Sequence, residues 1–318
     1  MPTIGATDLD VFPLCLGGNV FGWTADERQA FTVLDAYADA GGNFLDTADS
    51  YTRWVEGSSG GESETIIGRW TAARGNRDRI VVATKVGKLP ARRGLAPATI
   101  RAAADESLGR LGTDRIDLYY AHEDDPDTPI EQTLEAFGEL IAAGKVRHVG
   151  ASNITAPRLA EALAAADAGG LPHYVALQPR HNLVERDEYR GELADLCVRE
   201  GLGVMPYFAL ANGFLTGKYR PGADVDSERA EDAVPFLDDD GARVLAALDE
   251  IAAAHETTVA AVALAWLAAE PAVVAPIASA RTPGQLADLL PVAGLTLTAA
   301  EHERLTEAHP GARVEEHA

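Results

Sequence analysis

The sequence predicts a single-domain (β/α)₈ TIM barrel, and three observations support that fold. Short apolar runs alternate with longer helical patterns along the 318 residues. The links between them are short, as parallel strands joined by right-handed helical crossovers require. Eight such runs are present, and the chain length suits one barrel with insertions. A doubly wound open sheet is the structural alternative.

Several of the expected strands are rich in Val, Ile and Tyr, as strands buried on both faces should be. The eight expected strands cover residues 14–17, 43–46, 80–84, 116–120, 146–150, 175–178, 203–207 and 273–277, the first being the least distinct. Apolar residues at helical spacing predict helices over 26–40, 98–111, 130–143, 158–166, 187–199 and 242–254.

Two segments break this alternation. Residues 3–11 predict a small N-terminal hairpin ahead of the first strand. Residues 219–240 follow the seventh strand and predict a long, mobile acidic loop near the barrel mouth. Because no interdomain linker or low-complexity tract is present, residues 1–318 are expected to form one domain.

The composition excludes several partners. The chain has 27 Lys and Arg against 49 Asp and Glu, a net charge of −22, which repels nucleic acid. Cys15 and Cys197 are far apart, which indicates a reducing compartment. The first ten residues lack a secretory signal, and no apolar run is long enough for a bilayer. We therefore expect a cytoplasmic protein without a membrane partner.

Polar side chains follow most of the expected strands, at the end where barrel enzymes carry their active sites. One such residue is an ordinary cap or turn former, but a ring of them around one mouth indicates a site. The residues are Asp46, Lys85, His122, Ser152, Asn153, Gln178, Tyr207, Ser279 and Arg281.

Four residues suit carbonyl reduction. Tyr51 is expected to donate the proton, and the ammonium of Lys85 to lower the tyrosine pKa from about 10. Asp46 would hold the lysine in place, and His122 would hydrogen-bond and orient the carbonyl. Taken singly, three of them have a structural alternative: a cap for Asp46, a packing aromatic for Tyr51, and a structural imidazole for His122.

Other chemistries lack their motifs. The sequence has no G-x-S-x-G, HExxH or G-x-G-x-x-G. Residues 213–219 resemble a P-loop only superficially, because one residue is missing between the glycines and no Ser or Thr follows Lys218. The acidic run 123–127 predicts a solvated loop rather than a metal site, since no second His or carboxylate motif has metal-ligand spacing.

Essentially the whole chain resembles the aldo-keto reductase superfamily. Residues 43–51 are similar to the family's aspartate–tyrosine motif, and Lys85 and His122 fall at the other two tetrad positions. The resemblance implies a carbonyl substrate, NADP(H) bound without a Rossmann fold, and a monomer or weak homo-oligomer. Within it, Tyr207 would stack on the nicotinamide and Arg281 would contact the 2′-phosphate. The implied cofactor-binding residues are Gly18, Ser152, Asn153, Gln178, Tyr207, Phe208, Leu210, Gly213, Lys218, Ser279, Arg281, Gln285 and Asp288.

Three positions depart from the family pattern. Phe208 and Ala209 stand where Ser-Pro is frequent, and Leu289 replaces an asparagine that often closes the adenine site. Trp23 and Trp54 are expected to bind substrate, with a loop-packing role as the alternative for Trp54. The rival functions are a cofactor-bound regulatory barrel, as in the ion-channel β subunits of the superfamily, and an unrelated barrel lyase or isomerase.

Overall fold

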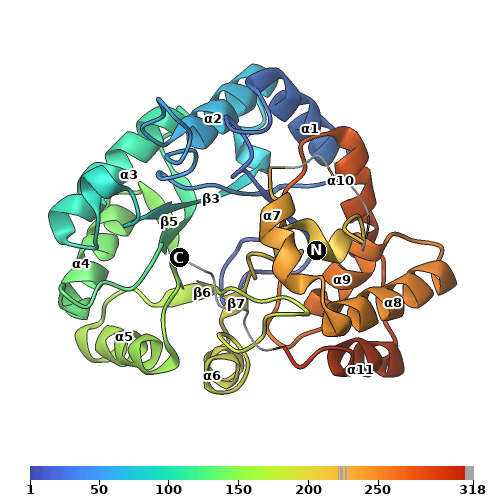
Figure 1. Cartoon of the computed structure of the whole chain (residues 1–318). Coiled ribbons are helices and arrows are strands. Elements are labelled where there is room, and N and C mark those ends of the chain that lie inside the picture. The colour runs from blue at the N-terminus through green and yellow to red at the C-terminus, as the bar shows by residue number, and fades with distance from the viewer. Residues whose placement is uncertain (221, 223–224, 226–227, 312–318) are drawn as a thin grey trace.

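The computed structural model describes residues 1–220, 222, 225 and 228–311, and it confirms the (β/α)₈ barrel. Eight parallel strands are hydrogen-bonded in the order β7-β6-β5-β4-β3-β2-β1-β8. The ring closes through a parallel bridge between Val204 and Val273, where the Val204 amide donates to the Ala272 carbonyl at 2.9 Å. Helices surround the strands (Figure 1).

The strands are β1 (Cys15–Gly17), β2 (Phe44–Asp46), β3 (Val81–Val86), β4 (Ile116–Ala121), β5 (Val146–Ser152), β6 (Tyr174–Gln178), β7 (Gly203–Val204) and β8 (Ile277–Ala278). The α-helices are α1 (Glu27–Asp39), α2 (Glu62–Arg74), α3 (Pro97–Leu111), α4 (Ile130–Ala142), α5 (Ala156–Gly169), α6 (Glu192–Glu200), α7 (Ala230–Ala233), α8 (Asp239–Ala254), α9 (Val259–Ala268), α10 (Pro283–Leu289) and α11 (Ala299–Glu307). Short 3₁₀ turns lie at η1 (Arg77–Arg79), η2 (Pro90–Arg92), η3 (Ala211–Thr216), η4 (Val234–Phe236) and η5 (Leu290–Ala293).

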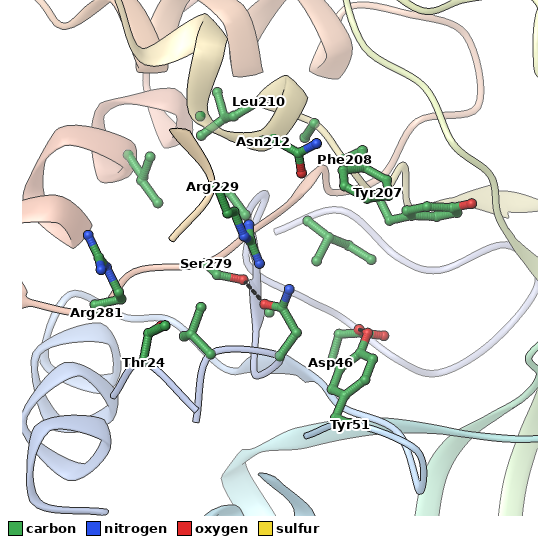
Figure 2. A pocket seen from close by; sticks show the side chains of 18 of the residues that line it. Thr24, Asp46, Tyr51, Tyr207, Phe208, Leu210, Asn212, Arg229, Ser279 and Arg281 are labelled. Atoms are coloured by element: carbon green, nitrogen blue, oxygen red, sulfur yellow. Dashed lines mark hydrogen bonds between the residues drawn. The ribbon is translucent and has the colours of Figure 1, made fainter. Parts of the chain in front are cut away.

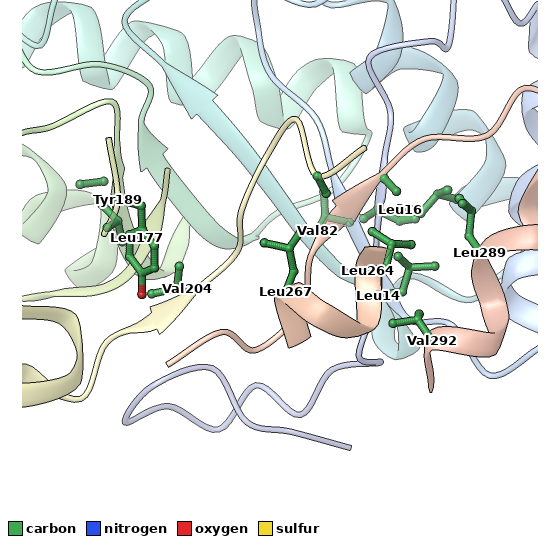
Figure 3. Packing of buried hydrophobic residues seen from close by; sticks show 14 of the residues in the cluster. Leu14, Leu16, Val82, Leu177, Tyr189, Val204, Leu264, Leu267, Leu289 and Val292 are labelled. Carbon is green, nitrogen blue, oxygen red and sulfur yellow. The ribbon is translucent and has the colours of Figure 1, made fainter. Parts of the chain in front are cut away.

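Each strand sends alternate side chains into two separate cores, as the period of two requires. In β1, Cys15 belongs to the interior cluster, whereas Leu16 belongs to the cluster between strands and helices. Figure 3 shows part of the outer cluster, in which Leu264 and Leu267 of α9 lie beside Leu14 and the strands. The inner face of the barrel thereby stays separate from the helix-facing layer.

The N-terminal hairpin fills the bottom of the barrel. Thr3 and Asp10 form an antiparallel bridge, as predicted for residues 3–11. Ile4, Leu9 and Val11 are at most 1% exposed and join the interior cluster of strand residues. The end of the barrel opposite the strand C-termini is therefore closed by apolar side chains.

Helical periodicity in the sequence does not predict several of the observed helices correctly, and the reason differs between them. In α2 the buried set includes Ser63, Glu64 and Thr71, so no apolar stripe marks the helix. In α9 nearly every side chain is buried, so the apolar pattern has no polar face. Helix α6 begins at Glu192, because residues 187–191 form the loop that leads into it.

The seventh and eighth strands are shorter than expected. β7 covers only Gly203–Val204, and β8 begins where the predicted strand 273–277 ends. The predicted acidic loop 219–240 contains α7 and η4, so it is partly helical. Residues 221, 223–224 and 226–227 lie outside the described residues, and the expected mobility of the loop stays a prediction.

No single helix in the described part of the chain combines the length and apolar character needed to cross a membrane. Helices α8 and α9 have this length and character only when taken together, and a 97° bend separates them. Among the described residues, no group of three or more His, Cys, Asp or Glu is arranged to hold a metal ion.

Candidate active site

Strand periodicity brings the four predicted reactive side chains to one mouth of the barrel. Asp46, Lys85 and His122 each lie two residues beyond an interior apolar residue of β2, β3 and β4. Because side chains alternate along a strand, these three point to the same inner side, at the C-terminal rim. Tyr51 reaches them from the loop after β2.

A buried ammonium holds these groups together. Lys85 is fully buried, and its Nζ donates to Asp46 Oδ2 at 2.6 Å, to Tyr51 OH at 2.8 Å and to the Thr47 carbonyl at 2.7 Å. The Tyr51 hydroxyl in turn donates to Asp46 Oδ2 at 3.0 Å. A buried charge is tolerated when it is paired and fully hydrogen-bonded, and all three ammonium protons here have acceptors. The network fixes the phenol oxygen beside a cation.

The expected direction of the Tyr51 pKa was wrong. Burial, followed by the carboxylate of Asp46, raises the pKa of Tyr51 well above 10. The sequence interpretation considered the attraction between Lys85 and a Tyr51 phenolate. It did not consider the Asp46 carboxylate, which lies beside the same oxygen and repels a phenolate. The phenol therefore keeps its proton at neutral pH, as a proton donor must.

His122 is held as a neutral imidazole. Burial, reinforced by the positive charges of Lys85, Lys88 and Arg53, keeps the pKa of His122 well below its usual range. Its Nδ1 lies 3.5 Å from Ser50 Oγ. A neutral ring retains one N–H donor, which is the group needed to polarise a carbonyl oxygen.

An amide network links the tetrad to the next strands of the barrel. Gln178 Nε2 donates to Asp46 Oδ1 at 2.8 Å, and Ser152 Oγ donates to the Gln178 carbonyl at 2.8 Å. Asn153 Nδ2 donates to Ser152 Oγ at 3.0 Å, and the Tyr207 hydroxyl donates to Asn153 Oδ1 at 2.6 Å. Donors, acceptors and one aromatic face are thus fixed beside the tetrad.

A cleft of about 870 Å³ opens over this network. Figure 2 shows Tyr51, Asp46 and Tyr207 at one end, Arg281 and Thr24 at the other, and Arg229 between them. The predicted site residues that line the cleft are Trp23, Asp46, Tyr51, Trp54, His122, Ser152, Asn153, Gln178, Tyr207, Phe208, Leu210, Gly213, Lys218, Ser279, Arg281, Gln285 and Asp288.

Gly18 is the predicted cofactor-binding residue that does not line the cleft, although Gly17 and Asn19 on either side do. The Gly18 amide donates to the Asp46 carbonyl at 2.7 Å, and an added Cβ would lie 2.7 Å from Ser63 Oγ. Its small size lets the end of β1 approach β2 closely. The geometry thus gives Gly18 a packing role.

The far end of the cleft carries cations and hydroxyls. Lys218 and Arg281 have no carboxylate within ion-pair distance among the described residues. The Arg281 amide donates to Gln285 Oε1 at 2.8 Å, and Ser279 Oγ donates to Asn19 Oδ1 at 2.6 Å. These cations are suited to bind anionic groups.

Sequence reasoning missed Asn19, Lys88 and Arg229, which also line the cleft. The Arg229 guanidinium lies 5.5 Å from the centre of the Trp23 ring. Arg229 directly precedes α7, inside the segment that was predicted as a loop. A loop has no regular periodicity, so its sequence does not indicate which side chain points into the cleft. The available signal was that Arg229 is one of only two basic residues in the acidic segment 219–240.

Both predicted substrate-binding tryptophans stand at the tetrad end. Trp54 packs edge-on against Trp23 at 5.7 Å and against Tyr51 at 6.2 Å between ring centres. Trp54 is 47% exposed, so its outer face is open to solvent. The three rings form an aromatic wall that ends at the Tyr51 hydroxyl.

Comparison with known proteins agrees with this geometry. A model of the aldo/keto reductase family matches residues 13–310. The uncharacterised oxidoreductase YrpG of Bacillus subtilis is 34% identical over 97% of this chain and 95% of its own. Norsolorinic acid reductase stcV of Emericella nidulans is 32% identical, over 94% of this chain and 79% of its own. A probable voltage-gated potassium channel subunit beta of Arabidopsis thaliana is 34% identical, covering 89% and 88%. With an Asp–Tyr–Lys–His cluster at the mouth of a (β/α)₈ barrel, the chain belongs to the aldo/keto reductase family.

Proposed function

We propose that the protein reduces aldehydes or ketones to alcohols with NADPH, using Tyr51 as the proton donor. The observation that carries this proposal is the Tyr51 hydroxyl, held 2.8 Å from the buried Lys85 ammonium beside a cleft. Two relatives support carbonyl reduction for this chain, because YrpG is named as an oxidoreductase and stcV as a reductase.

The donor set of the cleft fits a nicotinamide dinucleotide. Ser152, Asn153 and Gln178 offer the amide and hydroxyl groups that a carboxamide needs, and Tyr207 offers a ring for stacking. At the other end, Lys218 and Arg281 would bind phosphates, with Arg281 selecting the 2′-phosphate of NADPH. The family resemblance extends these cofactor contacts to Phe208, Leu210, Gly213, Ser279, Gln285 and Asp288, all of which line the cleft.

The chain's own groups then manage the proton. When bound, the dihydronicotinamide supplies a hydride to the carbonyl carbon. Tyr51 transfers its phenolic proton to the carbonyl oxygen, and the Lys85 ammonium stabilises the phenolate that remains. The neutral imidazole of His122 hydrogen-bonds the same oxygen and orients it. Asp46 holds Lys85 in position through the 2.6 Å contact.

Tyr51→Phe tests the assignment, because it deletes the proton and keeps the ring. We expect kcat to fall by roughly 10²-fold or more, as for loss of a general acid, with NADPH affinity nearly unchanged. Tyr119→Phe is the matched control, since the Tyr119 hydroxyl is buried and outside the cleft. Reduction is followed by NADPH absorbance over a panel of carbonyl compounds, and wild-type turnover by Tyr51→Phe would exclude Tyr51 as the donor.

A regulatory barrel that binds cofactor with little turnover is the second candidate, because one relative is named as a potassium channel β subunit. The complete Asp–Tyr–Lys–His cluster favours the enzyme. NADPH binding by wild type without reduction of any carbonyl in the panel would favour the regulatory role instead.

We further propose that the protein acts in the cytoplasm as a monomer or weak homo-oligomer, with a small carbonyl compound as its partner and no nucleic acid or membrane. The net charge of −22 and two buried free cysteines support this view.

A further inference from the structure

The tetrad end of the cleft carries more positive charge than the proposed chemistry uses. Lys88 follows β3 and lines the cleft. Its charge and that of Arg53 both lower the pKa of His122, so both cations lie within electrostatic reach of the imidazole. Arg53 is exposed on the loop after β2, where the described residues include no carboxylate partner for it.

The neighbouring acids leave this charge incompletely neutralised. Glu123 lies 3.7 Å from Lys88 Nζ and is shared with Arg93 at 3.2 Å. The next two acids are engaged elsewhere, Asp124 with Arg158 at 2.9 Å and Asp125 with a backbone amide at 2.7 Å.

Around Lys88, three cations therefore face one available carboxylate, in a protein of net charge −22. Partial burial lowers the pKa of Lys88, and the charges of Lys85 and Arg53 act in the same direction, whereas Glu123 opposes the shift. A positive rim of this kind attracts an anion against the field of the whole molecule.

The aromatic wall lies at the same end of the cleft. Tyr51, Trp54 and Trp23 line the cleft together with Lys88. The ring centre of Trp54 lies 6.2 Å from that of Tyr51 and 5.7 Å from that of Trp23. These rings present edges and faces against which a planar group can pack. A substrate whose carbonyl reaches Tyr51 thus meets aromatic surface on its body and a cation nearby.

We propose that the substrates are aromatic carbonyl compounds that carry a carboxylate, and that Lys88 binds this carboxylate. The inference rests on the proposed reductase function and assigns a substrate class to it. Lys88 is a binding residue here and takes no part in proton transfer.

The test compares 4-formylbenzoate with its methyl ester, which has the same ring and aldehyde but no charge. Wild type is expected to show about 10-fold higher kcat/KM for the acid, the range of a charge-assisted hydrogen bond at a partly exposed site. Lys88→Met should abolish this preference by lowering kcat/KM for the acid about 10-fold more than kcat/KM for the ester. Lys88→Arg should keep it, and Lys145→Met, on the opposite end of the barrel, is the control for charge removal alone.

Terephthalate binding, followed by tryptophan fluorescence, provides a readout that does not depend on turnover. Binding should weaken about 10-fold in Lys88→Met and stay unchanged in Lys145→Met. The carboxylate site would be overturned if wild type had the same kcat/KM for the acid and the ester. Equal losses of kcat/KM for both compounds in Lys88→Met would also overturn it. Absence of turnover for every carbonyl tested, with terephthalate binding still dependent on Lys88, would instead reject the proposed reductase function and keep the anion site.

Discussion

A single buried carboxyl group illustrates how strongly one residue responds to its surroundings. Asp49 is 1% exposed, and neither carboxyl oxygen has a hydrogen-bond partner among the described residues. Burial, followed by the negative charge of Glu64, raises the pKa of Asp49 from 3.8 to about 7. Glu64 itself is paired with Arg110 at 2.6 Å. The folded state therefore prefers Asp49 neutral, and the preference has a consequence for stability.

Asp49→Asn should stabilise the protein increasingly as the pH rises. Because the folded pKa lies above the unfolded value, the stability that Asp49 contributes as a neutral acid is complete below pH 3.8 and is lost as the pH rises toward about 7. The asparagine cannot ionise, so its advantage should grow by about 2.6 kcal/mol between pH 5 and pH 8. Urea unfolding at the two pH values measures this difference.

Asp127→Asn is the control for that experiment, because Asp127 is exposed. An advantage of Asp49→Asn that is the same at both pH values would mean that Asp49 does not titrate in this window.

The tetrad shows which properties of a residue the sequence reveals. Position after an apolar strand was enough to bring Asp46, Lys85 and His122 to one mouth, since strand periodicity is local information. The raised pKa of Tyr51 depends on its burial and on a carboxylate five positions away that accepts a hydrogen bond at 3.0 Å. Such a sum of opposing effects requires coordinates, and the sequence interpretation considered only one of them.

At the scale of elements, prediction succeeded where each element has its own pattern. Strands β3 to β6 contain several Val, Ile or Tyr residues each, and the expected ranges of β1 to β6 all overlap the observed ones. Helices α2 and α9 have no such pattern, because one buries polar residues and the other is buried all around. The position of Arg229 over the cleft depends on the packing of α7, which no local signal announces.

The N-terminal hairpin is the element whose contribution is easiest to isolate. Ile4 is fully buried among interior barrel side chains at the end away from the tetrad. Ile4→Ala should lower the free energy of unfolding by about 2–5 kcal/mol, the usual cost of a cavity in a core. Because the cavity lies at the closed end, kcat at a temperature where the variant is folded should stay near the wild-type value.

Thr7→Ala provides a comparison on the same hairpin, since it removes the hydroxyl that donates to the Ile4 carbonyl and accepts from the Leu9 amide, but no large apolar side chain. Denaturant titrations measure the free energy of unfolding of both variants. If Ile4→Ala loses no more of it than Thr7→Ala does, the hairpin does not close the barrel.

At the scale of the whole molecule, one cleft joins the first strand to the last. Its lining runs from Gly17 at the end of β1 to Leu289 in α10, and the ring of strands closes beside it. A ligand that spans this cleft must stabilise the entire barrel, because its contacts exist only when both ends of the chain are in place. The effect of cofactor on the melting temperature thus reports on the distant contact at Arg281.

NADPH at 100 times its Kd should stabilise the wild-type barrel by about 2.7 kcal/mol, which corresponds to a Tm increase of several degrees. Loss of the Arg281 guanidinium should weaken NADPH binding roughly 10- to 100-fold. At the same NADPH concentration, Arg281→Ala should then gain only about 0.4–1.4 kcal/mol. The smaller Tm shift produced by NADH should stay unchanged, because NADH has no 2′-phosphate.

Arg199→Ala, which removes an exposed arginine on α6, controls for loss of a surface cation. Thermal melts with each cofactor decide the matter: equal losses for NADPH and NADH in Arg281→Ala, or no loss for either, would remove Arg281 from the 2′-phosphate site.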